Sequence, residues 1–78
     1  MKVCEFRVTA AFPLGPDFVQ RTRELEGIIG HTCAGSGAGC GERDVDWYFD
    51  TKRKAVIAYN KLRKVEWVKE SGWELVRP

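Results

Sequence analysis

One histidine and three cysteines are the residues of this chain best suited to bind a metal ion or to act as nucleophiles. His31, Cys33 and Cys40 lie close together, and Cys4 stands alone near the start. Small zinc sites are usually built from paired ligands such as CxxC or HxxxH, and the spacing HxC followed by x6C does not fit them. We therefore expect no metal and no cofactor. The odd number of cysteines favours free thiols, and a Cys33–Cys40 disulfide would form only after oxidation.

The same residues do not form a catalytic set. A Cys–His dyad needs its two side chains within hydrogen-bonding distance and a third group that orients the histidine. His31 and Cys33 would lie on the same face of an extended segment, but this glycine-rich segment is expected to be a mobile edge. The chain has a single histidine, and no serine–histidine–acid triad is evident around it. We expect no catalytic residues and predict that the protein is not an enzyme.

Residues 31–41, HTCAGSGAGCG, form an unusual segment that holds half of the glycines in the chain. A phosphate-binding P-loop ends in GK[ST] and opens a helix, whereas Gly41 is followed by Glu42 and Arg43 and then by a strand pattern. The composition instead favours either a flexible loop or a short edge strand over residues 31–34 that leads into a glycine-rich hairpin turn.

Acidic residues follow this segment at Glu42, Asp44, Asp46 and Asp50. Neighbouring carboxylates can bind a hard cation such as Ca²⁺. However, Asp44 and Asp46 alternate with apolar residues, and this alternation is also what the solvent-facing side of an antiparallel strand requires. We therefore expect these carboxylates, together with Tyr48, to lie on an open and solvated face of a sheet.

The largest charge asymmetry lies in the second half of the chain. Residues 51–70 hold seven basic and two acidic residues, whereas residues 1–50 hold five basic and eight acidic ones. Basic side chains on an exposed helix can bind acidic proteins or nucleic-acid phosphates, although they often serve solubility alone. Trp67 lies off the apolar face of the expected helix, where an aromatic side chain can anchor an interface. We predict a partner-binding surface composed of Lys52, Arg53, Lys54, Arg63, Lys64 and Trp67.

The periodicity of apolar residues places the first half of the chain on two strands and a helix. Alternating apolar and polar residues predict strands over residues 3–12 and 44–50. Between them, a stripe with a period near 3.6 predicts a helix that starts at Pro16 and ends before Gly30. Proline suits the first helical position, and glycine can adopt the left-handed conformation that ends a helix.

A second helix is predicted to start at a cap formed by Asp50 or Thr51. It ends near Lys64 or continues to Glu70, because the apolar stripe loses its period between these residues. A serine–glycine pair then breaks the pattern, and residues 73–76 form a short final strand.

The order strand, helix, weak strand, strand, helix, strand predicts an α+β fold, the ferredoxin-like βαββαβ plait. It has a four-stranded antiparallel sheet with two helices on one face. Its first and third strands are central, and the glycine-rich second strand lies at an edge. A βαβαβ arrangement without the weak strand is the alternative. We expect the larger apolar side chains to form one core: Phe6, Val8, Phe18, Leu25, Trp47, Phe49, Tyr59, Leu62 and Trp73.

The composition fits one small domain over residues 1–78, with 44% hydrophobic and 31% charged residues and a net charge of +2. No apolar run is long enough to span a membrane, and charged residues interrupt the first ten positions. We therefore expect a cytoplasmic protein that does not bind membranes.

These observations favour a small non-enzymatic binding protein that occupies a surface of a larger protein or nucleoprotein complex with an acidic surface. Small phage proteins that inhibit bacterial defence, including anti-CRISPR proteins, have this general profile of size and charge. The alternative is a nucleic-acid-binding domain that uses the basic second helix. Base stacking on the sheet, as in RNA-recognition domains, is disfavoured because the expected open face is acidic. On the central strands, Tyr48 is the only aromatic residue expected on that face.

Overall fold

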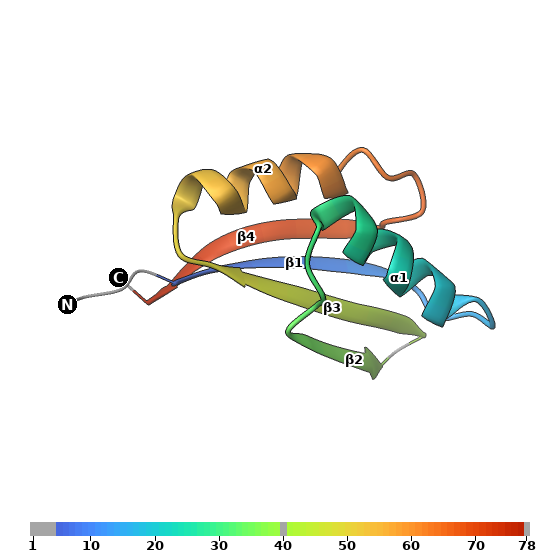
Figure 1. The fold of residues 1–78 in the computed structure, drawn as a ribbon. Coiled ribbons are helices and arrows are strands. Elements are labelled where there is room, and N and C mark those ends of the chain that lie inside the picture. The colour runs from blue at the N-terminus through green and yellow to red at the C-terminus, as the bar shows by residue number, and fades with distance from the viewer. Residues whose placement is uncertain (1–4, 40, 78) are drawn as a thin grey trace.

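The fold is seen in a computed structural model that describes residues 5–39 and 41–77. Four strands and two helices follow one another along the chain (Figure 1). Their bounds are β1 Glu5–Pro13, α1 Phe18–Ile29, β2 Gly35–Gly39, β3 Glu42–Phe49, α2 Lys52–Leu62 and β4 Glu70–Arg77. Cys4 and Cys40 lie outside the described residues, and so does the Cys33–Cys40 disulfide considered above.

The strands form one antiparallel sheet in the order β2-β3-β1-β4. Val8 of the central strand β1 lies opposite Trp47 of β3 on one side and opposite Trp73 of β4 on the other. Both helices cover the same face of this sheet (Figure 1), and the other face is open. The predicted α+β architecture with a four-stranded antiparallel sheet and two helices is confirmed, as is the edge position of the glycine-rich strand.

The core lies between the helices and the covered face of the sheet. Its largest fully buried side chains come from β1, β3 and both helices: Val8, Phe12, Leu25, Val45, Trp47 and Leu62. Other members of the predicted core are partly buried and pack against this cluster: Phe6, Phe18, Phe49 and Tyr59. The prediction is wrong for Trp73, which is 36% exposed because β4 is an edge strand. Phe12 belongs to the core because it continues the alternation of Val8 and Ala10.

Gly30 and Thr51 end and begin the helices as predicted, whereas α1 begins at Phe18 rather than at the predicted Pro16. Gly30 ends α1 in the left-handed conformation, with φ 88°, and its N–H bonds back to the last turn. Thr51 precedes α2, and its hydroxyl oxygen accepts the N–H of Lys54 at 3.2 Å. α2 ends at Leu62, close to the shorter of the two predicted lengths. Trp67 consequently lies in the connection between α2 and β4.

The position of β2 differs from the prediction. The strand occupies residues 35–39 rather than 31–34, so the glycines form the edge strand itself instead of the turn after it. Gly35 lies opposite Asp46 of β3. Strand pairing needs only backbone N–H and C=O groups, which glycine supplies, although the low strand propensity of glycine hides such a strand in the sequence.

Side-chain hydrogen bonds hold residues 31–34, the predicted position of this strand, in an irregular connection. The indole N–H of Trp47 donates to the carbonyl oxygen of His31 at 2.9 Å. The backbone N–H of Cys33 donates to the carboxylate of Glu26 at 2.8 Å. These bonds satisfy backbone groups that would otherwise need strand partners.

β4 is longer than predicted, because it begins at Glu70 rather than at residue 73. Ser71 pairs with Ala10, and Gly72 pairs with Thr9. An edge strand pairs on one side only, so it accepts a serine–glycine pair that would weaken a central strand.

Candidate partner-binding surfaces

The predicted partner-binding residues lie at the two ends of α2 and in the connection that follows it. Lys52, Arg53 and Lys54 form the first turn of α2, whereas Arg63 and Lys64 follow its last residue. The helix has 11 residues, which corresponds to about 16 Å at the helical rise. The structure therefore divides the basic side chains into two groups rather than joining them in one patch.

The group at the first turn is partly engaged within the molecule. Lys54 Nζ lies 3.1 Å from Asp50 Oδ1, and this hydrogen bond lowers the pKa of Asp50 below its ordinary value. The ammonium group of Lys52 lies 5.5 Å from the ring centroid of Trp73 on β4. The side chain of Arg53 is exposed. These three positive side chains lie at the N-terminus of α2, which is the positive end of the helix dipole. Their interaction with the dipole is unfavourable, and the turn therefore attracts anions.

Trp67 is half-buried against the core rather than exposed. Its ring meets Phe12 edge to face, with 5.3 Å between the centroids and 83° between the planes. The guanidinium group of Arg21 lies 5.2 Å from the centroid of the Trp67 ring. Arg63 lies instead over the ring of Tyr59, at 5.7 Å. The tryptophan therefore packs into the fold, and the arginine that covers it comes from α1.

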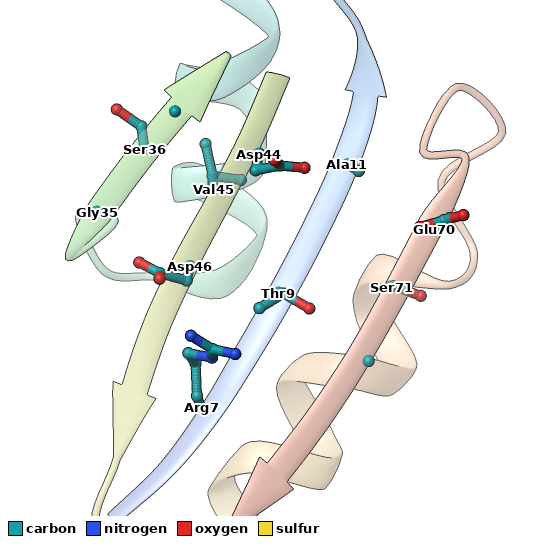
Figure 2. Close-up of a pocket in the computed structure, with 12 residues that line it drawn as sticks. Arg7, Thr9, Ala11, Gly35, Ser36, Asp44, Val45, Asp46, Glu70 and Ser71 are labelled. Atoms are coloured by element: carbon teal, nitrogen blue, oxygen red, sulfur yellow. The ribbon is translucent and has the colours of Figure 1, made fainter. Parts of the chain in front are cut away.

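The open face of the sheet contains a hollow of about 570 Å³ (Figure 2). Residues of all four strands line it, with small residues on β1, β2 and β4 and acidic residues on β3 and β4. The side chains that shape it are Arg7, Thr9, Ala11, Asp44, Asp46 and Glu70, together with three glycines, Gly35, Gly37 and Gly72. Sequence reasoning predicted the acidic open face but not this hollow, for which the only signal is that residues without large side chains recur on neighbouring strands.

Asp46 has an unusual environment in this hollow. A Cβ atom at Gly35 would lie 2.8 Å from Asp46 Oδ1, so the carboxylate occupies the space that a side chain on β2 would fill. Asp46 Oδ1 is covered and has no hydrogen-bond donor among the described residues. The nearby Arg7 is paired with Glu74, whose negative charge raises the pKa of Arg7. The carboxylate of Asp46 therefore has unused hydrogen-bonding capacity.

The two layers of the molecule carry opposite charge. The acidic residues Asp44, Asp46 and Glu70 line the hollow on the open face of the sheet. On the other layer, residues 52–64 include six basic residues and no acidic one. The asymmetry that the sequence shows along the chain is therefore also an asymmetry across the molecule.

The histidine and thiol candidates are held in separate environments. The ring of His31 packs edge-on against Phe49, with 6.1 Å between the centroids. Cys33 is a half-buried free thiol, and burial together with a hydrogen bond to Glu26 raises its pKa. Within the described part of the chain, no three His, Cys, Asp or Glu side chains are grouped as a metal site requires.

Neither α1 nor α2, the two helices of the described residues, has the length and apolar character needed to cross a membrane. Comparison of the chain with protein-family models, with curated proteins and with solved structures finds no significant match. The function is therefore inferred from the geometry and the charge of this chain alone.

Proposed function

We propose that the protein is a small non-enzymatic binding protein that uses α2 to occupy an acidic surface of a larger protein or nucleoprotein partner. The main support is a set of basic side chains that have no counter-charge among residues 5–39 and 41–77. Of the five predicted basic residues, Lys54 alone forms an ion pair within the described residues. The others are exposed: Lys52, Arg53, Arg63 and Lys64.

An acidic partner would relieve an unfavourable arrangement in the free protein. Positive charges in the first turn of α2 face the positive end of the helix dipole, and an approaching carboxylate would stabilise both. Arg63 and Lys64 would meet a second acidic group about 16 Å away, one helix length. Two separated charge contacts fix the orientation of a complex, and their long-range attraction raises its rate of association.

An inhibitor that covers the working surface of a larger machine is one form that this function would take, as in the phage proteins that block bacterial defence. We also propose the ferredoxin-like plait as the finer description of the fold. Its support is the strand order β2-β3-β1-β4 with both helices on one face. This scaffold holds α2 rigidly through Ala55, Ala58 and Leu62, which are buried.

Nucleic-acid binding is the alternative, and the two basic groups of α2 are the observation in its favour, because phosphates would suit them as well as carboxylates do. The open face of the sheet argues against a platform for stacked bases. Asp44, Asp46 and Glu70 would repel phosphates there, and Tyr48 is the only exposed aromatic residue of the central strands.

The test is affinity capture from a lysate of the cells that make the protein, with and without nuclease. Three charge-reversal variants serve as baits beside the parent. Arg53→Glu and Lys64→Glu each alter one end of α2. Arg23→Glu, at an exposed position of α1 with no ion pair among the described residues, is the matched control. Melting curves of the four proteins should agree to within about 0.5 kcal/mol, as is usual for surface substitutions.

We expect the parent and Arg23→Glu to retain the same partner after nuclease treatment, and both α2 variants to lose most of it. The loss should appear mainly as slower association and should resemble the effect of added salt. Loss of the partner on nuclease treatment would favour the nucleic-acid alternative. Retention by both α2 variants, or equal loss with Arg23→Glu, would rule out α2 as the binding surface.

A further inference from the structure

β2 is an edge strand whose outer side lacks the usual protection. Free backbone N–H and C=O groups at a sheet edge can pair with another chain, and proteins normally shield them with charged side chains, proline, bulges or a covering segment. β2 has the sequence GSGAG, and residues 36–39 are exposed. Alternate residues of a strand direct their backbone groups to each side, so part of this strand remains available outside β3.

The glycines of β2 also leave room for a carboxylate beside that edge. Gly35 shares the open face of the sheet with Asp46 directly opposite it. Figure 2 shows the side chain of Asp46 directed from β3 toward β2, whereas that of Asp44 turns toward β1. Because Gly35 has no side chain, the Asp46 carboxylate lies over its backbone. Any larger residue at position 35 would separate the carboxylate from the outer edge.

We propose that β2 binds an extended basic segment of another protein, which adds to the sheet as a fifth strand and places a lysine or arginine against Asp46. A strand outside β2 would lie about 9.6 Å from β3, two strand spacings. A side chain of the added strand that lies opposite Gly35 would point to the open face. Because Gly35 has no side chain, the added side chain could extend across this position toward Asp46. Only a long side chain spans that distance, and only a basic one matches Asp46 and the acidic hollow beyond it.

Three features of the site favour this partner together. The backbone edge supplies hydrogen bonds in a ladder, as in other cases of strand addition. The carboxylate of Asp46, whose covered Oδ1 has no hydrogen-bond donor among the described residues, supplies a negative charge for the ammonium or guanidinium group. Asp44 and Glu70 in the same hollow supply a negative potential that attracts a basic chain. The site is distinct from α2, and the inference does not depend on the function proposed above.

A second copy of this chain fits the edge less well. Its own β2 would bring only glycine, serine and alanine, so Asp46 would gain no counter-charge. Pairing of the two β2 strands about a two-fold axis would also place two acidic β3 strands on one continuous face. They would be about 14 Å apart, three strand spacings, with like charges facing each other.

The test uses capped fluorescent peptides of equal composition and charge. The probe alternates lysine and valine over six residues, which is the pattern of a strand with one basic face. One control has three lysines followed by three valines. A second control keeps the alternating order but carries N-methyl groups on alternate amides, which removes hydrogen-bond donors from one edge. Fluorescence anisotropy gives the affinities, and amide hydrogen exchange of the protein locates the bound peptide.

We expect the alternating peptide to bind at least about tenfold more tightly than either control, a difference of about 1.4 kcal/mol. It should protect amides of residues 35–39 from exchange. Asp46→Asn should weaken binding by up to about fivefold, the upper range of a solvent-accessible ion pair. Asp44→Asn is the matched variant and should weaken it less, because its side chain turns toward β1. Arg53→Glu and Lys64→Glu should not weaken it.

Four results would overturn the proposal. Equal binding of the alternating and block peptides would mean attraction to net charge alone, as would equal effects of Asp44→Asn and Asp46→Asn. Protection confined to α2 or β4 would place the peptide elsewhere. Protection of residues 35–39 without peptide, together with a dimer in sedimentation, would show that a second copy occupies the edge.

Discussion

Trp47 connects the core to the segment that leads into β2. Its side chain is 2% exposed and belongs to the same buried cluster as Phe12 and Leu25. Its indole N–H also reaches the carbonyl oxygen of His31. The residue therefore contributes both buried apolar area and a hydrogen bond that fixes an irregular piece of backbone.

We expect Trp47→Phe to lower the free energy of unfolding by about 2–3 kcal/mol. The substitution leaves a small cavity and an unpaired carbonyl group at His31. Trp73→Phe is the matched control, and at that half-exposed edge position it should cost less than about 1 kcal/mol. Urea unfolding followed by circular dichroism measures both. Equal midpoints for the two variants would contradict the roles assigned to these tryptophans.

Cys33 provides a second prediction at this scale, because burial and Glu26 raise its pKa. In a Cys4→Ser/Cys40→Ser background Cys33 is the single thiol, and its thiolate fraction can be followed through its reaction with iodoacetamide. A raised pKa leaves less thiolate at a given pH, so the curve of rate against pH should rise at higher pH in the folded protein than in urea. Glu26→Gln should move the midpoint part of the way back.

The midpoint of this curve, rather than the absolute rate, is the quantity to compare, because burial also slows access of the reagent to the thiol. A folded protein whose midpoint coincides with that of the urea-unfolded chain would contradict the assigned environment of Cys33.

At the scale of elements, the sequence predicts those strands and helices whose side chains differ between a buried and an exposed face. β1 and β3 show this alternation, and Gly30 and Thr51 mark helix ends by their capping chemistry. β2 could not be placed in this way, because a glycine strand has no side chains from which to read a period. Its position depends on pairing with β3, a tertiary contact.

The candidate site was predictable in composition but not in arrangement. The basic residues are close in sequence, yet one length of α2 separates Lys54 from Arg63. The position of Trp67 is set by the connection after α2, which brings it against Phe12, and no periodic pattern describes such a connection. The hollow on the open face forms where residues have small side chains or none. In the sequence, such residues indicate only a weak strand and give no sign of a hollow.

Two glycines of β2 give a prediction about this element. Gly35→Ala should lower the free energy of unfolding by about 1 kcal/mol, because its Cβ would lie 2.8 Å from Asp46 Oδ1 and displace that side chain. At Gly37 a Cβ meets nothing within 4 Å, so Gly37→Ala should be neutral or stabilise the fold by up to about 1 kcal/mol.

Thermal unfolding compares the stabilities of Gly35→Ala and Gly37→Ala, two substitutions on the same strand and the same face. Adding Asp46→Ala to Gly35→Ala should recover part of the loss, because the two sites are in contact. If both glycine variants melt together, Asp46 does not occupy the space over Gly35.

At the scale of the whole molecule, the two inferred surfaces lie on different parts of the fold. α2 belongs to the helical layer, whereas β2 forms the edge of the sheet beside β3 and has no pairing with β1 or β4. A partner on one surface therefore leaves the other accessible. The opposite charges of the layers would also direct acidic and basic partners to different sides of the molecule.

The central place of β1 has a consequence for how the protein is made. β1 is the earliest described strand to be synthesised, yet its partners are β3 and β4, and Phe6 pairs with Leu75. At the usual 5–20 residues per second, roughly 3–13 s pass between the synthesis of β1 and that of β4. Mixed α/β domains of this size fold within about milliseconds to a second once complete. The time for which the apolar face of β1 stays open to chaperones or to aggregation is therefore set by the speed of translation.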